Sequence, residues 1–144
     1  MITFKDINNI NSYTFAGELF HAYQQQEYGN LLEIKNSADQ KGRSNIEFEE
    51  KFMNLSMGII SGTYYGSFSD MDGVADWILT QIDNNNGNFP TSFSDTQQQE
   101  YLSFVNNFQQ ANIGNGTGYG TPVDPSLNQP NAVISIISNS NCEQ

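Results

Sequence analysis

The part of this sequence whose residue types and spacing could do chemistry surrounds a single histidine. The stretch G-E-L-F-H covers residues 17–21, and His21 is the only histidine in the chain. In a helical H-E-x-x-H, two histidines four residues apart share one face and bind zinc, while the glutamate activates a water molecule. Here Gly17 stands at the first histidine position, and Glu18 and His21 stand at the other two. The stretch therefore predicts part of a zinc site with one ligand missing.

A second acidic residue is predicted to face the protein core from another helix. Advancing about 100° per residue from Ile46 places the apolar residues of this helix over one wide arc. Glu49 falls inside that arc, whereas Glu47 and Glu50 fall outside it. A buried carboxylate is costly unless it is paired or binds a metal. Glu49 is therefore a candidate partner of His21.

The two segments together resemble zincin metallopeptidase domains of the gluzincin type. GELFHAYQ and NIEFEEKF are similar to H-E-L-x-H-A on one helix and to an E-x-E-A-like segment on a second. Such domains are common in bacterial effector and toxin proteins, and the resemblance covers about residues 14–53. It implies a zincin-like core, with Glu18 at the position of the general base and with His21 and Glu49 as metal ligands.

Gly17 departs from the gluzincin pattern, because glycine offers no ligand atom. We therefore expect a degenerate, catalytically inactive domain of bacterial origin that acts as a binding module or pseudoenzyme. We expect no cofactor; if the site still functions, the expected cofactor is zinc.

Two other interpretations of the pattern stay open. Glu18, His21 and Glu49 can be a coincidence, with His21 an ordinary half-buried histidine bonded to a carboxylate. They can also belong to an active metallopeptidase, if an aspartate, another glutamate, Cys142 or a partner's residue replaces the missing ligand.

Other sites with a recognisable motif fit the sequence less well. No G-x-S-x-G accompanies His21, and NGTGYG lacks the lysine and the following helix of a phosphate loop. A calcium loop that begins at Asp83 would have glycine at its fifth position instead of its sixth, and Ser94 instead of glutamate at its twelfth.

The charge of the chain restricts its partners. The formal net charge is −11, and only five residues are lysine or arginine. Nucleic acid is not expected as a partner, because phosphate binding needs clustered cations. A basic partner protein is the alternative function, as in an immunity protein or a decoy. We see no signal peptide and no apolar stretch long enough to span a membrane, so a cytoplasmic protein is expected, or a secreted one if the chain is part of a longer effector. The oligomeric state is left open.

Apolar periodicity predicts a mainly α fold of about four helices. They cover about residues 14–29, 45–61, 70–82 and 94–112, and Ser94 with Gln97 forms a capping box at the start of the last one. A small β element at residues 1–13, 31–34 or 132–137 would make the fold α+β. Residues 1–112 are expected to form one domain. Residues 113–144, which are rich in Gly, Pro and Asn, are expected to pack on it or to be partly disordered.

Overall fold

The described part of the chain contains six helices and no strand. The structure is a computed structural model that describes residues 12–63 and 69–140. In chain order the helices are α1 (Ser12–Tyr28), α2 (Leu31–Asn36), α3 (Arg43–Ser61), α4 (Val74–Asn84), α5 (Asp95–Ala111) and α6 (Asn131–Ser140). The predicted mainly α fold is confirmed.

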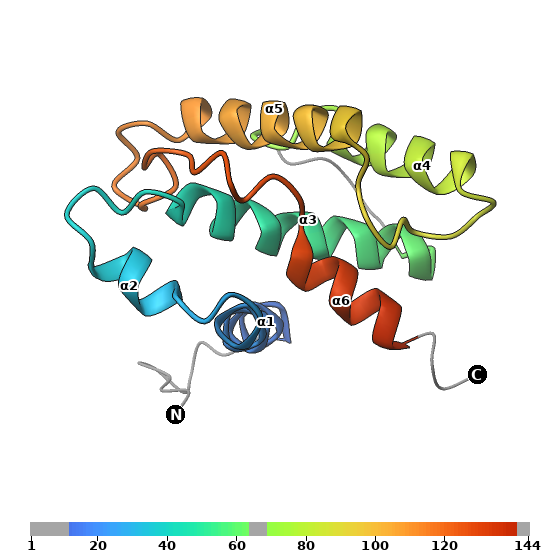
Figure 1. Cartoon of the computed structure of the whole chain (residues 1–144), viewed down its shortest axis with the longest axis horizontal. Coiled ribbons are helices and arrows are strands. Elements are labelled where there is room, and N and C mark those ends of the chain that lie inside the picture. The colour runs from blue at the N-terminus through green and yellow to red at the C-terminus, as the bar shows by residue number, and fades with distance from the viewer. Residues whose placement is uncertain (1–11, 64–68, 141–144) are drawn as a thin grey trace.

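Helix α3 lies at the centre and contacts all five other helices. Figure 1 shows α4 and α5 together on one side of α3, with α1, α2 and α6 on the other side. The sequence of α3 explains this position. Ile46, Phe48, Phe52 and Leu55 are all buried, and they point in more than one direction around the helix.

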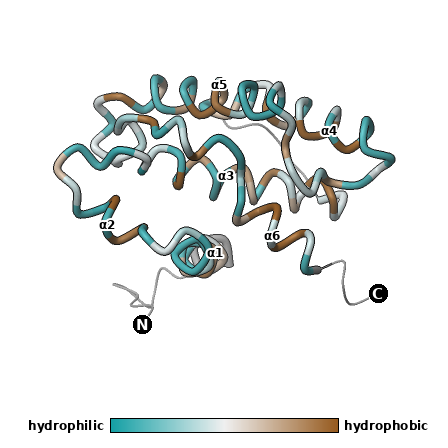
Figure 2. Tube along the Cα trace, viewed as in Figure 1, coloured by the Kyte–Doolittle hydropathy of each residue, from teal (hydrophilic) through white to brown (hydrophobic). Residues whose placement is uncertain are grey.

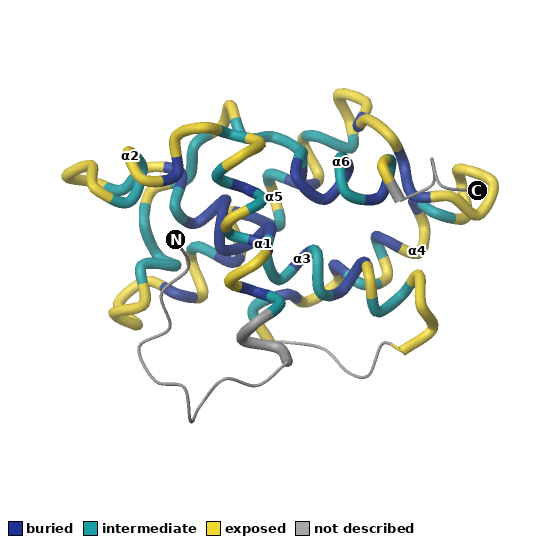
Figure 3. Tube along the Cα trace, turned by 90° about the horizontal axis from the view of Figure 1, so that it is seen from below, coloured by how far each residue is buried: buried dark blue, intermediate teal, exposed yellow. Residues whose placement is uncertain are grey.

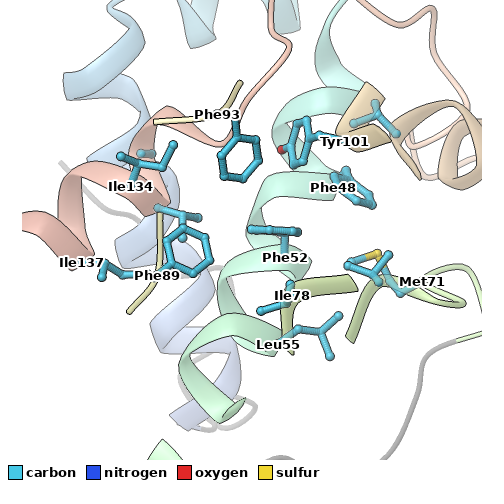
Figure 4. Packing of buried hydrophobic residues seen from close by; sticks show 14 of the residues in the cluster. Phe48, Phe52, Leu55, Met71, Ile78, Phe89, Phe93, Tyr101, Ile134 and Ile137 are labelled. Carbon is cyan, nitrogen blue, oxygen red and sulfur yellow. The ribbon is translucent and has the colours of Figure 1, made fainter. Parts of the chain in front are cut away.

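Aromatic side chains fill the core between α3 and α5. Phe48 and Phe52 both meet Tyr101 edge to face, with ring centroids 5.3 and 5.4 Å apart. Phe89 and Phe93, from the loop before α5, extend this cluster, which Figure 4 shows. Apolar residues recur along the helices (Figure 2), and buried stretches alternate with exposed ones along the chain, the buried ones facing inward (Figure 3).

Helix boundaries follow local signals. Helix α5 begins with the predicted capping box, in which the Gln97 backbone N–H donates to Ser94 Oγ and the Ser94 N–H donates to Gln97 Oε1. Helix α1 ends at Tyr28, and the next residue, Gly29, has a φ of 71° and donates its N–H to the Gln25 carbonyl oxygen. These ends agree with the sequence patterns.

Two of the three suggested β elements are helices instead. Residues 31–34 lie in α2, and residues 132–137 lie in α6. The β-branched residues of α6 favour a strand locally. However, the Glu49 carboxylate accepts hydrogen bonds from the Ala132 and Val133 N–H groups and so stabilises a helix start there. The third element, residues 1–13, lies almost entirely outside the described residues.

The segment that follows α5 packs along α3. Ser44 Oγ lies 2.6 Å from the Tyr119 and Thr121 carbonyl oxygens, either of which can accept its single proton. Asn45 Nδ2 donates to the Asp124 carbonyl oxygen, and Asn45 Oδ1 accepts from the Asp124 N–H. Beyond this loop, α6 places its apolar residues in the same core as α3 and α5. None of the described helices combines the length and apolarity that a membrane span requires.

Candidate metal centre

Helices α1 and α3 pack so that His21 faces two carboxylates. His21 Nε2 lies 3.5 Å from Glu50 Oε2 and 3.7 Å from Glu47 Oε2. Glu47 and Glu50 are three residues apart and therefore share one face of α3. One ligand atom from each of the three residues lies within 4.8 Å of the others. This arrangement is a group that could hold a metal ion.

Gly17 provides the space for the Glu50 carboxylate. Gly17 is buried on the same face of α1 as His21, one turn earlier. A Cβ atom at this position would overlap Glu50 Oε1. The carboxylate of Glu50 thus occupies the space beside Gly17, which stands at the first histidine position of the H-E-x-x-H pattern.

Gln24 fixes which nitrogen of His21 faces the two carboxylates. Gln24 Nε2 donates to the Ile46 carbonyl oxygen at 3.0 Å and to Glu49 Oε2 at 2.8 Å. Because a carbonyl oxygen can only accept, the amide orientation is determined, and Gln24 Oε1 must accept from His21 Nδ1–H at 2.8 Å. His21 Nε2 is then left to carry either a proton or a metal ion.

The neighbouring carboxylates favour a positive charge at this nitrogen. Burial lowers the pKa of His21, but Glu50 and Glu47 more than offset this effect, so that the pKa lies above its ordinary value of 6.5. Without a metal, the imidazolium form balances part of the carboxylate charge. A metal ion at Nε2 would replace that proton, so metal affinity should rise with pH.

The cluster opens into a polar cleft of about 360 Å³. Helices α1, α2 and α3 contribute to its walls, and so do Thr117 and Tyr119 from the segment before α6. Arg43 lies at one side, with its Nε 3.5 Å from Glu47 Oε1. Glu47 is only 6% exposed, and its ion-pair distances of 3.5 and 3.7 Å are longer than good hydrogen bonds.

The distances fit a small divalent ion. Two ligand atoms that are each about 2.0–2.2 Å from a tetrahedral zinc ion lie about 3.4 Å apart. The distances from His21 Nε2 to the two carboxylates are close to this value, so small rotations of the glutamates would complete a three-ligand site. Imidazole and carboxylate are suitable ligands for zinc.

The four residues singled out from the sequence have different surroundings. Gly17, Glu18 and His21 line the cleft, and Glu18 is exposed there. Glu49 is 1% exposed, which confirms its predicted burial. Its carboxylate accepts hydrogen bonds from Gln24, Tyr28 and the start of α6.

Glu49 is linked to His21 through Gln24. Burial raises the pKa of Glu49 to about 7, although the four donors around it act in the opposite direction. In this arrangement Glu49 orients the residue that holds His21, while Glu47 and Glu50 are the nearer candidates for ligands.

Glu47 and Glu50 were placed outside the apolar arc of α3 by sequence reasoning and were not connected with His21. Their spacing of three residues on one helix face was the available signal. It becomes informative only when α1 is known to cover that face, and this cover is also why Glu47 is buried.

No protein-family model, curated protein or solved structure matches this chain.

Proposed function

We propose that this protein is a degenerate zincin-like binding module that holds a divalent metal ion, most suitably zinc, through His21, Glu47 and Glu50. The observation that carries the proposal is the pair of carboxylates 3.5 and 3.7 Å from His21 Nε2. Glu50 takes the place of the ligand that Gly17 cannot supply. Gln24 holds the imidazole in the tautomer that a metal needs.

A binding role is favoured over peptide hydrolysis by the charge of the ligands. A bound zinc ion supplies Lewis acidity to its ligands and to water. Two carboxylates balance most of the charge of a divalent ion, which weakens its power to polarise a carbonyl group or a water molecule. The same two carboxylates favour tight retention of the ion.

Zinc calorimetry tests this proposal. The parent chain is expected to bind one zinc ion with release of a proton, because His21 Nε2 must lose its proton. His21→Gln and Glu50→Gln should each weaken binding by about 100-fold or more, since loss of a ligand costs at least as much as loss of its supporting residue. Glu27→Gln, which changes an exposed acid of α1 outside the cleft, is the matched control. Equal affinities in all four proteins, or no binding by the parent, would overturn the proposal.

A second candidate function is binding of a basic partner protein. No lysine, arginine or histidine follows Lys51 in the sequence. Exposed acids on α4, α5 and the loop before α4 are Asp72, Asp76, Asp83, Asp95 and Glu100. Both helices lie on the same side of α3 (Figure 1), which concentrates negative charge there.

The acidic side predicts salt-sensitive binding. The affinity of the protein for a polylysine peptide should fall steeply as the salt concentration rises. At one salt concentration, the double variant Asp76→Asn/Glu100→Gln should bind the peptide more weakly than the parent, whereas Glu33→Gln on α2 should bind it as the parent does. Equal effects of these changes would mean that net charge alone attracts the peptide.

Hydrolysis remains a third candidate because Glu18 lines the same cleft as the three proposed ligands. In a hydrolase, its carboxylate would accept a proton from the attacking water. We expect no cleavage of casein by the zinc-loaded protein. Cleavage that disappears in Glu18→Gln would instead identify an active peptidase with Glu50 as the replacement ligand.

A further inference from the structure

The cleft next to the proposed metal centre gathers positive charge in an acidic protein. The chain has only five lysine and arginine residues, and two of them, Lys35 and Arg43, line this one cleft. They come from different elements, since Lys35 lies in the last turn of α2 and Arg43 begins α3. The connection between α2 and α3 therefore brings both cations to the same cleft as His21.

The two cations differ in how they are held. The guanidinium of Arg43 donates to Gln40 Oε1 at 2.8 Å and to the Thr117 carbonyl oxygen at 3.5 Å, and it faces Glu47. Arg43 Nε is buried without a hydrogen-bond partner. Lys35 has no carboxylate within 4 Å among the residues that the structure describes, although it is only half-exposed. Its ammonium group is thus available to an incoming anion.

We propose, on the basis of the metal centre proposed above, that this cleft binds a small molecule with a carboxylate or phosphate group, which contacts the metal ion and the Lys35 ammonium together. Arg43 contributes positive charge from the adjoining wall. The volume of about 360 Å³ suits a small organic acid or a phosphate ester.

Charge balance explains why the anion should need the metal. Before the ion is bound, Glu18, Glu47 and Glu50 oppose the charges of the basic residues in the cleft. A divalent ion neutralises the two ligand carboxylates. The two cations then outnumber the one remaining carboxylate, that of Glu18, so the cleft becomes positive and attracts anions.

Cobalt spectroscopy separates the two proposals. The full chain is loaded with one equivalent of Co²⁺, whose visible d–d absorption reports protein ligands, and is then titrated with acetate and with methylphosphonate. Each anion that binds should change the absorption, and the affinity should fall by about fivefold in Lys35→Gln, as expected for a half-exposed ion pair. Lys41→Gln is the matched control, because Lys41 is an exposed lysine of the same connection that does not line the cleft.

The possible outcomes are distinct. Absence of the Co²⁺ absorption in the parent would overturn the metal centre itself. Absorption that neither anion changes, or an equal loss of affinity in the Lys35 and Lys41 variants, would overturn the anion site and leave the metal centre standing. Binding of the anions with equal affinity without any metal would also overturn the inference. A response to acetate alone or to methylphosphonate alone would identify the ligand as a carboxylate or as a phosphate.

Discussion

Replacement of Gly17 by alanine should separate the stability of the fold from metal affinity. The new Cβ would overlap Glu50 Oε1, which is the end of a flexible side chain and can rotate away. The backbone of α1 need not move. The substitution therefore acts on the proposed ligand and leaves the helix packing in place.

The two effects have opposite signs. Alanine in a helix interior is favoured over glycine by about 1 kcal/mol, so the free energy of unfolding of the metal-free protein should stay unchanged or rise by up to that amount. Displacement of Glu50 removes one of the three proposed ligands, so zinc affinity should fall by about 100-fold or more. A purely structural role of Gly17 would lower stability and would not affect metal binding selectively.

A double-mutant cycle provides the assay. Zinc affinity is measured by calorimetry for the parent, Gly17→Ala, Glu50→Gln and the double variant, and stability is measured by urea unfolding without metal. Since both changes disable the same ligand, the double variant should bind zinc about as weakly as Glu50→Gln alone. Additive losses, or a parent-like affinity of Gly17→Ala, would refute the role given to this glycine.

Three further predictions concern the buried polar groups. The free energy of unfolding should fall by up to about 3 kcal/mol as pH rises from about 4.5 to 7, because the pKa of Glu49 is about 7 in the folded protein and 4.5 in the unfolded chain. The raised pKa of His21 should continue this fall above pH 6.5. Urea unfolding at a series of pH values measures this dependence, and Glu49→Gln should make it flatter. Glu49→Ala should cost about 2–4 kcal/mol, because its buried donors lose their acceptor; a loss below about 1 kcal/mol in urea unfolding would contradict this account. Asn45→Ala should speed hydrogen exchange of residues 120–128, which its amide holds, whereas Asn54→Ala should not, because Asn54 Nδ2 is buried without a hydrogen-bond partner.

Local sequence signals predicted α3 and α5 well. Helix α5 combines a capping box at Ser94 with apolar residues at helical spacing, so that every local preference agrees with the final structure. Helix α6 was missed because its β-branched residues suggest a strand. The acceptor that stabilises its start, Glu49, lies 83 residues earlier in the chain.

The orientation of α1 was also not predictable from apolar periodicity. Leu19, Ala22 and Tyr23 share one stripe at helical spacing, which predicts that this side of α1 faces inward, but Leu19 is 45% exposed. The face that is buried contains Phe20 together with Gly17 and Gln24. Because glycine and glutamine add nothing to an apolar pattern, the pattern pointed to the wrong side of the helix.

Only part of the candidate site was predicted, because the rest depends on how α1 and α3 pack. Burial of Glu49 followed from its angle on α3, and the structure confirms it. The approach of Glu50 to His21 depends on the empty volume beside Gly17, which exists only once α1 and α3 have packed. Sequence spacing could not reveal a contact made through the absence of a side chain.

The hydrogen bonds between Glu49 and the start of α6 have a consequence for how the protein folds. They close a loop of more than eighty residues around the central helix, and every other helix precedes α6 in the chain. A nascent chain that has emerged only as far as α5 lacks these donors and the apolar face of α6. We therefore expect folding to be all-or-none and limited by closure of this long-range contact, so that a chain truncated after residue 112 would populate a loosened, aggregation-prone intermediate.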